Sequence, residues 1–167
     1  MSRAEQILDV AQDLLDEQGA SALSMRTIAT RVGIRAPSLY RHFPDKAAIE
    51  AGLQERALGD LAGTLAAAGS GLPALADAYR GWALAHPNRY RLSSGQSLRR
   101  DRLAPGVEAA ASAPLWAAVG GEPELVRALW GFAHGLVDLE LAGRFPPDAD
   151  LAATWAAGIA AFSRGLR

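Results

Sequence analysis

Apolar residues recur along this chain at intervals of three and four, and turn-forming Gly and Pro residues separate the apolar segments. In the first segment, Ile7, Ala11 and Leu14 fall on one face of a helix, with Leu8 and Leu15 beside them. No window shows the sustained period of two that marks a half-buried strand. The pattern therefore predicts an all-α protein.

Local capping signals indicate where the first helices begin and end. Ser2 with Glu5 three residues later has the pattern of a capping box. Ser24 and Asp45 are typical N-cap residues, and Gly33 can end the short helix that Ser24 begins. The expected helices occupy residues 2–19, 24–33, 36–43, 46–68, 72–85, 101–119, 122–143 and 148–166. A short turn is expected at residues 88–92.

The last two expected helices are apolar on most of their faces. Their large apolar residues are Trp130, Phe132, Leu136, Val137, Leu139, Leu141, Leu151, Trp155, Ile159 and Phe162. A chain of this size would struggle to cover both helices by itself. A subunit interface through the last two helices is the economical explanation.

Composition excludes several classes of protein. The chain has 167 residues and 17.5 kDa, of which 50% are hydrophobic and 21% charged, so it can bury a core and is not expected to be disordered. The absence of cysteine excludes a disulfide framework, a thiol nucleophile and a cysteine-based metal site. A net charge of −1 excludes a strongly basic tail but allows a local basic patch.

Neither end of the chain resembles a membrane segment. The first eighteen residues carry five acidic side chains, unlike a signal peptide. The longest nearly uncharged stretch near the end, 151–162, has twelve residues, whereas a membrane-spanning helix needs about 20. We therefore expect a soluble, cytoplasmic protein with no membrane partner.

Residues 24–46 combine a helix-turn-helix pattern with local positive charge. Ala29 followed by Gly33 allows two short helices to cross closely, because one side chain is small and the glycine can adopt the turn conformation. The basic residues of this window outnumber its single acid, Asp45, by five to one, a balance of +4 that suits phosphate contact. They are Arg26, Arg31, Arg35, Arg41 and Lys46.

Two motifs extend this pattern to a known family. The run Ile28-Ala29, Val32-Gly33-Ile34, Ser38-Leu39-Tyr40, His42-Phe43 and Lys46 resembles the amino-terminal DNA-binding domain of TetR-family transcriptional regulators over residues 3–50. Residues 129–135 (LWGFAHG), with 85–92 (AHPNRYRL), are similar to the family's ligand-domain pattern named for its Trp, His and Gly (WHG). One departure is Arg35, which stands where the family often has a capping Ser.

The resemblance implies a helix-turn-helix DNA-binding domain at 1–47, joined by a long helix to a helical ligand-binding and dimerisation domain at 48–167. It implies a homodimer that binds a pseudo-palindromic operator, in most cases as a repressor, and that responds to a small-molecule effector without a cofactor.

Residue types and the resemblance together assign DNA contacts to the start of the second helix, the third helix and the start of the fourth. These residues are Arg26, Thr27, Arg35, Ala36, Pro37, Ser38, Tyr40, Arg41, His42 and Lys46. Phe43 is expected in the core. Arg31 fits either a solvated surface residue or a phosphate contact.

His134 and Asp138 lie four residues apart on an otherwise apolar helix, so they share one face. They fit a polar pair in a helix or subunit interface, or the polar part of a ligand pocket. A metal site would need a third ligand, and beyond His134 only His86 lies outside the DNA-binding part. The candidate pocket residues are Tyr79, Trp82, Trp116, Trp130, His134 and Asp138.

Two alternatives to a ligand-responsive repressor stay open at this point. A ligand-independent DNA-binding regulator is one, because the part after Lys46, about 120 residues, is short for a domain with a large pocket. An enzyme that uses His134 and Asp138 is the other. No nucleophile elbow, H-E-x-x-H motif or phosphate-binding glycine loop supports it, so no catalytic or metal residue is assigned.

Overall fold

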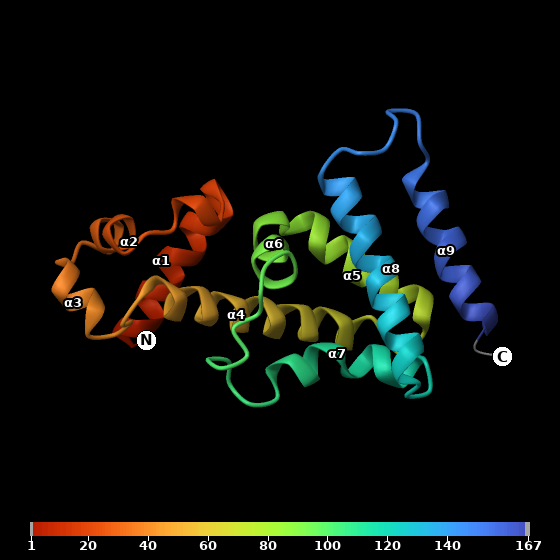
Figure 1. The fold of residues 1–167 in the computed structure, drawn as a ribbon, viewed down its shortest axis with the longest axis horizontal. Coiled ribbons are helices and arrows are strands. Elements are labelled where there is room, and N and C mark those ends of the chain that lie inside the picture. Colours follow the sequence, from red (N-terminus) through yellow and green to blue (C-terminus); the bar gives the residue numbers. More distant parts are fainter. Residues whose placement is uncertain (1, 166–167) are drawn as a thin grey trace. The chain divides into compact units, whose positions relative to one another are not determined.

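The computed structural model describes residues 2–165, which form nine α-helices and one short 3-10 helix, without a strand in that range (Figure 1). The predicted all-α class is thereby confirmed. The elements are α1 (Arg3–Gln18), η1 (Ala20–Ala22), α2 (Met25–Val32), α3 (Ala36–Tyr40), α4 (Lys46–Ala67), α5 (Leu72–Ala85), α6 (Pro87–Ser94), α7 (Val107–Ala118), α8 (Pro123–Leu141) and α9 (Leu151–Gly165).

The predicted capping signals act as expected. Ser2 Oγ accepts from the Glu5 amide at 3.1 Å while the Glu5 carboxylate accepts from the Ser2 amide, which completes the capping box on α1. Ser24 Oγ accepts from the third amide of α2 at 3.0 Å. Asp45 Oδ1 accepts from the Ala48 amide at 2.7 Å on α4. Gly33 ends α2 in the left-handed conformation, at φ 76°.

The middle of the chain differs from the prediction. The short turn expected at 88–92 is wrong: this stretch is helix α6, because Pro87 can occupy a first helical turn without losing a hydrogen bond. The helix expected from residue 101 begins only at Val107, after Gly106 with φ 85°. The expected last helix begins at Leu151, and its expected end at residue 166 lies outside the described residues.

By contacts, the chain divides into two compact units. The first contains residues 2–58 and 86–107, and the second contains 59–85 and 108–165. Helix α4 contributes to both. The division at residue 47 that the sequence predicts is a division by role, between DNA binding and ligand binding with dimerisation. It stays a prediction.

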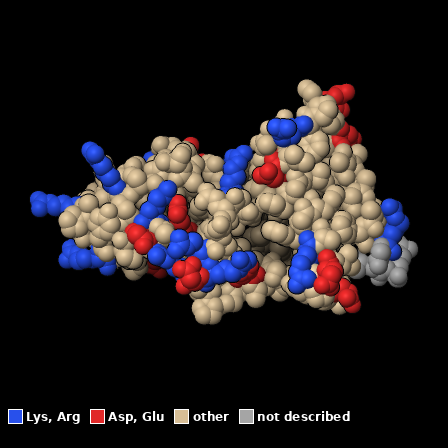
Figure 2. All heavy atoms as spheres, in the orientation of Figure 1, with Lys and Arg blue, Asp and Glu red and all other residues tan. Residues whose placement is uncertain are grey.

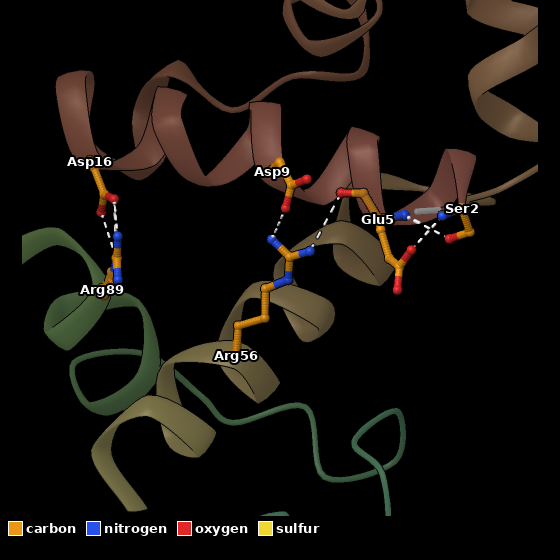
Figure 3. A network of polar contacts seen from close by, with 6 residues as sticks. All are labelled: Ser2, Glu5, Asp9, Asp16, Arg56 and Arg89. Atoms are coloured by element: carbon orange, nitrogen blue, oxygen red, sulfur yellow. Dashed lines mark hydrogen bonds and ion pairs between the residues drawn. The ribbon is translucent and has the colours of Figure 1, made fainter. Parts of the chain in front are cut away.

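The core of the first unit joins α6 to the amino-terminal helices. Leu92 of α6 is buried in the same cluster as the apolar faces of α1 to α4. Two ion pairs on α1 accompany this packing: Arg56 of α4 binds Asp9 at 2.8 Å, and Arg89 of α6 binds Asp16 (Figure 3). Buried members of the cluster are Ile7, Ala11, Leu14, Leu15, Leu23, Ile28, Ala29, Leu39, Phe43, Ile49, Leu53 and Leu92.

In the second unit, α5 is linked to both α8 and α9, which run antiparallel (Figure 1). Arg80 of α5 forms a two-bond ion pair with Glu140 of α8, at 2.9 and 2.7 Å. This carboxylate raises the pKa of Arg80 above its ordinary value. The indole of Trp155 on α9 donates to Asp77 of α5 at 3.0 Å.

Helices α8 and α9 approach closely at Gly158. The ring of Phe132 on α8 lies over this glycine and packs against Trp155 and Phe162, at centroid distances of 6.0 and 5.4 Å. A Cβ at position 158 would come to 2.6 Å from Cε2 and 2.8 Å from Cε1 of this ring, and still closer to Cζ. The absence of a side chain at Gly158 is therefore a packing requirement.

We expect Gly158→Ala to lower the free energy of unfolding by about 1–2 kcal/mol, because overpacking outweighs the gain in helix propensity. Gly81→Ala on α5 is the matched control, since no atom lies within 4 Å of a Cβ there. This control should raise stability by about 0.5–1 kcal/mol. Urea unfolding measures whether the free energy of unfolding falls in the Gly158 variant and rises in the Gly81 variant. Equal stabilisation by both substitutions would contradict the packing argument.

Candidate nucleic-acid interface

Helices α2 and α3 cross with their apolar sides inward. Ile28 and Leu39 are fully buried at the crossing, and Ala29 is nearly so. The turn is closed by the Ile34 amide, which donates to the Ala29 carbonyl at 2.9 Å. Phe43, just after α3, is 9% exposed, which confirms its predicted place in the core. The small side chain and the left-handed glycine thus permit the crossing that the sequence predicts.

The opposite face of α3 is open to solvent. Tyr40 is 51% exposed although its neighbour Leu39 is fully buried. The backbone of Arg35 enters α3 in an extended conformation without a side-chain cap, and Arg41 Nη2 donates to Ser38 Oγ at 3.4 Å. Of the predicted contacts on and around this helix, Ser38 is half-buried, and the exposed ones are Arg35, Ala36, Pro37, Tyr40, Arg41 and His42.

The remaining predicted contacts lie at the first turns of α2 and α4. Arg26 and Thr27 are exposed at the start of α2, where Thr27 Oγ1 lies 2.7 Å from Ser24 Oγ. Lys46 opens α4, and its ammonium lies 3.2 Å from Glu50 Oε1. Free backbone amides at helix starts favour anions, so both places suit phosphate oxygens.

On the face that Figure 2 shows, basic side chains project from the end of the first unit that carries α2 and α3, away from the acidic side chains in view. Arg31 is engaged elsewhere: its guanidinium binds Glu17 of α1 at 2.6 Å. This hydrogen bond lowers the pKa of Glu17 and raises that of Arg31. Of the two interpretations left open for Arg31, this ion pair favours the surface residue over the phosphate contact.

The single acidic residue of the helix-turn-helix window has a partner distant in sequence. Arg102 Nη1 donates to Asp45 Oδ1 at 2.7 Å, and Arg102 Nη2 donates to Asp45 Oδ2 at 3.1 Å. This two-bond pair, together with the Ala48 amide, lowers the pKa of Asp45, and the carboxylate raises the pKa of Arg102. Reasoning from the sequence missed Arg102, because only the fold brings it to α4.

Arg102 belongs to the α6–α7 segment, residues 95–106, which is attached along α4 by hydrogen bonds. Gln54 is 2% exposed and uses both ends of its amide: Nε2 donates to the carbonyls of Leu92 and Ser97, at 3.0 and 3.4 Å. Gln54 Oε1 accepts from the Arg99 amide at 3.2 Å. The Ala104 amide donates to a carboxylate oxygen of Glu55, also at 3.2 Å.

The second unit contains a small apolar cavity of about 50 Å³, which is partly open to solvent. None of its lining side chains carries a charge. Two of the six predicted pocket residues, Tyr79 and Trp130, line it; Trp82, Trp116, His134 and Asp138 are not among the lining residues. The lining comprises Leu65, Leu72, Leu75, Ala76, Tyr79, Leu115, Leu129, Trp130, Ala133 and Ile159.

The four other predicted pocket residues have different surroundings. Trp82 is buried, and its indole donates to Asp60 at 3.0 Å. His134 stacks on Trp130, with ring centroids 5.3 Å apart and an interplanar angle of 13°. Trp116 and Asp138 are exposed on α7 and α8.

Two absences concern residues 2–165, the part of the chain that the structure describes. No three His, Asp or Glu side chains within that range are grouped closely enough to hold a metal ion. Over the same residues, no helix is both long and apolar enough to cross a membrane.

Comparisons with known proteins match both parts of the chain. The family described as bacterial regulatory proteins, tetR family, matches residues 7–52, and the tetracyclin repressor-like C-terminal domain matches residues 72–162, which include the LWGFAHG motif. An uncharacterized HTH-type transcriptional regulator, Rv0681 of Mycobacterium tuberculosis, is 32% identical over 155 residues, which cover 83% of this chain and 70% of the relative.

Solved structures match over nearly the whole chain. The crystal structure of SCO4313, named as a regulatory protein, has a TM-score of 0.77 and 28% identity, over 95% of this chain and 94% of that one. The multidrug binding protein EbrR, complexed with imidazole, shares the fold at a TM-score of 0.72 and 22% identity, covering 98% and 94% of the two chains.

Matches to both family domains, together with the exposed basic face around α3, lead to one assignment. The chain belongs to the TetR family of DNA-binding transcriptional regulators.

Proposed function

We propose that this protein is a homodimeric, ligand-responsive repressor that binds a pseudo-palindromic operator. The observation that carries the proposal is the split of α3 between a fully buried Leu39 and a half-exposed Tyr40, which leaves a face of α3 free for a major groove. In a dimer, two such helices would enter successive major grooves about 34 Å apart.

Contacts to DNA divide by chemistry. Ala36, Pro37 and Ser38 at the start of α3 suit base edges, because methyl and ring carbons complement a thymine methyl and a hydroxyl can donate or accept. Thr27 and Lys46, at the first turns of α2 and α4, suit phosphate oxygens. The residues proposed to extend these contacts are Arg26, Arg35, Tyr40, Arg41 and His42.

Dimerisation through α8 and α9 is supported by the surfaces that these helices leave uncovered. Leu139 is 43% exposed on α8, and small exposed residues recur at helical spacing on α9, where they would let a second backbone approach closely. The exposed alanines of α9 are Ala152, Ala153, Ala156, Ala157, Ala160 and Ala161.

The cavity in the second unit suits a small effector without charge. A ligand charge buried among these apolar side chains would lack a partner, which is costly. Leu65 of α4 lines the cavity, and α4 begins at Lys46, so an effector that displaces Leu65 would move the helix that carries a proposed phosphate contact. Coupling of about 1–3 kcal/mol would change operator affinity between about 5- and 150-fold.

A ligand-independent regulator is the second candidate, and the cavity weighs against it. An enzyme has less support, because His134 is stacked on Trp130 and no three His, Asp or Glu side chains among the described residues are grouped to hold a metal ion. Because the proposed target is chromosomal DNA, we place the protein in the cytoplasm.

The DNA probe is a duplex that the unaltered protein enriches from a random-sequence pool. Tyr40→Ala and Lys46→Ala should each weaken binding to this duplex by about tenfold or more. Lys46→Ala should also make the plot of log affinity against log salt shallower, by about 0.9 for each half-site. Arg144→Ala removes an exposed charge from the α8–α9 loop and serves as control. Unchanged affinity and salt slope in both variants would count against the assigned interface.

Ala156→Arg should convert the dimer to a monomer, because a bulky charge on the alanine face of α9 would have to be buried. Analytical ultracentrifugation measures the change, and operator affinity should fall with it. Ala117→Arg on the exposed part of α7 is the matched control and should stay dimeric. If the Ala156→Arg variant stays dimeric, the dimer interface lies outside this face of α9.

Octanol, octylamine and octanoate form a probe series of one chain length with different charge. Calorimetry should show octanol binding at least about tenfold more tightly than either charged compound, since no lining side chain carries an opposite charge. Ala133→Phe should abolish binding by filling the cavity, whereas Ala117→Phe should not. Equal binding of all three compounds would exclude this cavity as the site.

A further inference from the structure

Asp45 is an unfavourable residue at its position for a protein that binds DNA. It is the only acidic residue between positions 24 and 46, and it directly precedes Lys46, the proposed phosphate contact. Its carboxylate is needed locally, because it caps α4 through the Ala48 amide at 2.7 Å. Unpaired, however, the same carboxylate would repel a phosphate that approaches Lys46.

Arg102 removes this conflict by its geometry. Its two guanidinium nitrogens meet the two carboxylate oxygens of Asp45 at 2.7 and 3.1 Å, the fork arrangement that holds a carboxylate in one orientation. Arg102 and Asp45 are 32% and 47% exposed, so the pair lies in a partly solvated place where ion pairs add little to folding stability. Its main consequence is therefore electrostatic, at the proposed DNA surface.

The α6–α7 segment is anchored on both sides of Arg102. The Arg99 amide is bound by the buried Gln54 at 3.2 Å, and the Ala104 amide is bound by Glu55 at 3.2 Å. These two anchors on α4 hold a stretch of chain that has no helix of its own. The backbone on both sides of Arg102 is thus held in place, which positions the Arg102 guanidinium against Asp45.

The net charge around Asp45 and Lys46 depends on Arg102, because other charged side chains lie close by. Asp101 lies between two arginines, 3.5 Å from Arg99 and 3.8 Å from Arg102. Lys46 itself is paired with Glu50 at 3.2 Å. Loss of Arg102 would leave the Asp45 carboxylate without its two-bond partner, while Asp101 would keep its ion pair with Arg99.

We propose that Arg102, although it lies outside the helix-turn-helix, is a positioning residue for DNA binding: it neutralises Asp45 and fixes it as the cap of α4 beside Lys46. This inference rests on the proposed contact of Lys46 with phosphate. The segment between α6 and α7 thereby becomes part of the DNA-binding apparatus without contacting DNA itself.

A rescue experiment on the full-length protein tests the inference, with binding to the enriched duplex measured over a range of salt concentrations. For charges about 8 Å apart in water, Arg102→Ala should weaken binding about two- to threefold for each half-site, hence about fivefold for a dimer, with a shallower salt slope. Asn keeps the cap but not the charge, so Asp45→Asn combined with Arg102→Ala should restore affinity to within about twofold.

Two results would overturn the inference. If Arg102→Ala binds as tightly as the unaltered protein, Asp45 does not need neutralising. If the Arg102 variant is weakened but Asp45→Asn does not rescue it, Arg102 contacts phosphate directly or acts through the fold. Either result would leave the proposed function standing as long as Tyr40→Ala still loses binding, so the two failures are distinguishable.

Arg56→Ala is the matched control variant. It removes an ion pair of α4 with Asp9 at 2.8 Å, also within the first unit, ten residues after Lys46 and therefore about 15 Å further along the helix. Its binding and salt slope should equal those of the unaltered protein. Thermal unfolding of all variants should shift little, because each change removes a partly exposed pair.

Discussion

Burial of Leu39 is the constraint on which the proposed DNA-binding surface depends. Helix α3 has five residues, too few to be stable alone, so its orientation comes from tertiary packing. Leu39 is fully buried, and Phe43 extends the same contact beyond the helix end. Successive residues of a helix point about 100° apart, so burying Leu39 turns Tyr40 toward solvent. The chemistry of the exposed face is thus a consequence of the core beneath it.

Much of the first unit could be predicted because its signals are local. The caps Ser2, Ser24 and Asp45 each act on an amide three residues away, and Gly33 acts on its own turn. Such interactions depend on a few consecutive residues, which a sequence displays directly. The same reasoning missed α6, because a helix of eight residues begun by Pro87 is hard to distinguish from a turn until Leu92 is seen in the core.

Roles in the second unit could be predicted less well, because tertiary contacts decide them. Trp82 was an aromatic candidate for the pocket, but its indole binds Asp60 and its ring is buried elsewhere. Tyr79, three residues earlier on the same helix, does line the cavity. Helical periodicity shows that both residues can be buried without showing which cavity or partner receives them. The pairing of Asp45 with Arg102, 57 residues apart, is hidden from the sequence for the same reason.

Helix α4 links these observations, because single residues along it meet different parts of the molecule. Its first turn carries Lys46 and is capped by Asp45, its middle binds the α6–α7 segment through Gln54 and Glu55, and Leu65 near its end lines the apolar cavity. A regulatory response of about 1–3 kcal/mol is comparable to one or two hydrogen bonds or a partly exposed ion pair. The proposed regulation therefore requires no large rearrangement: a displacement of α4 that loosens a few of these contacts would alter the position and charge of the surface beside Lys46.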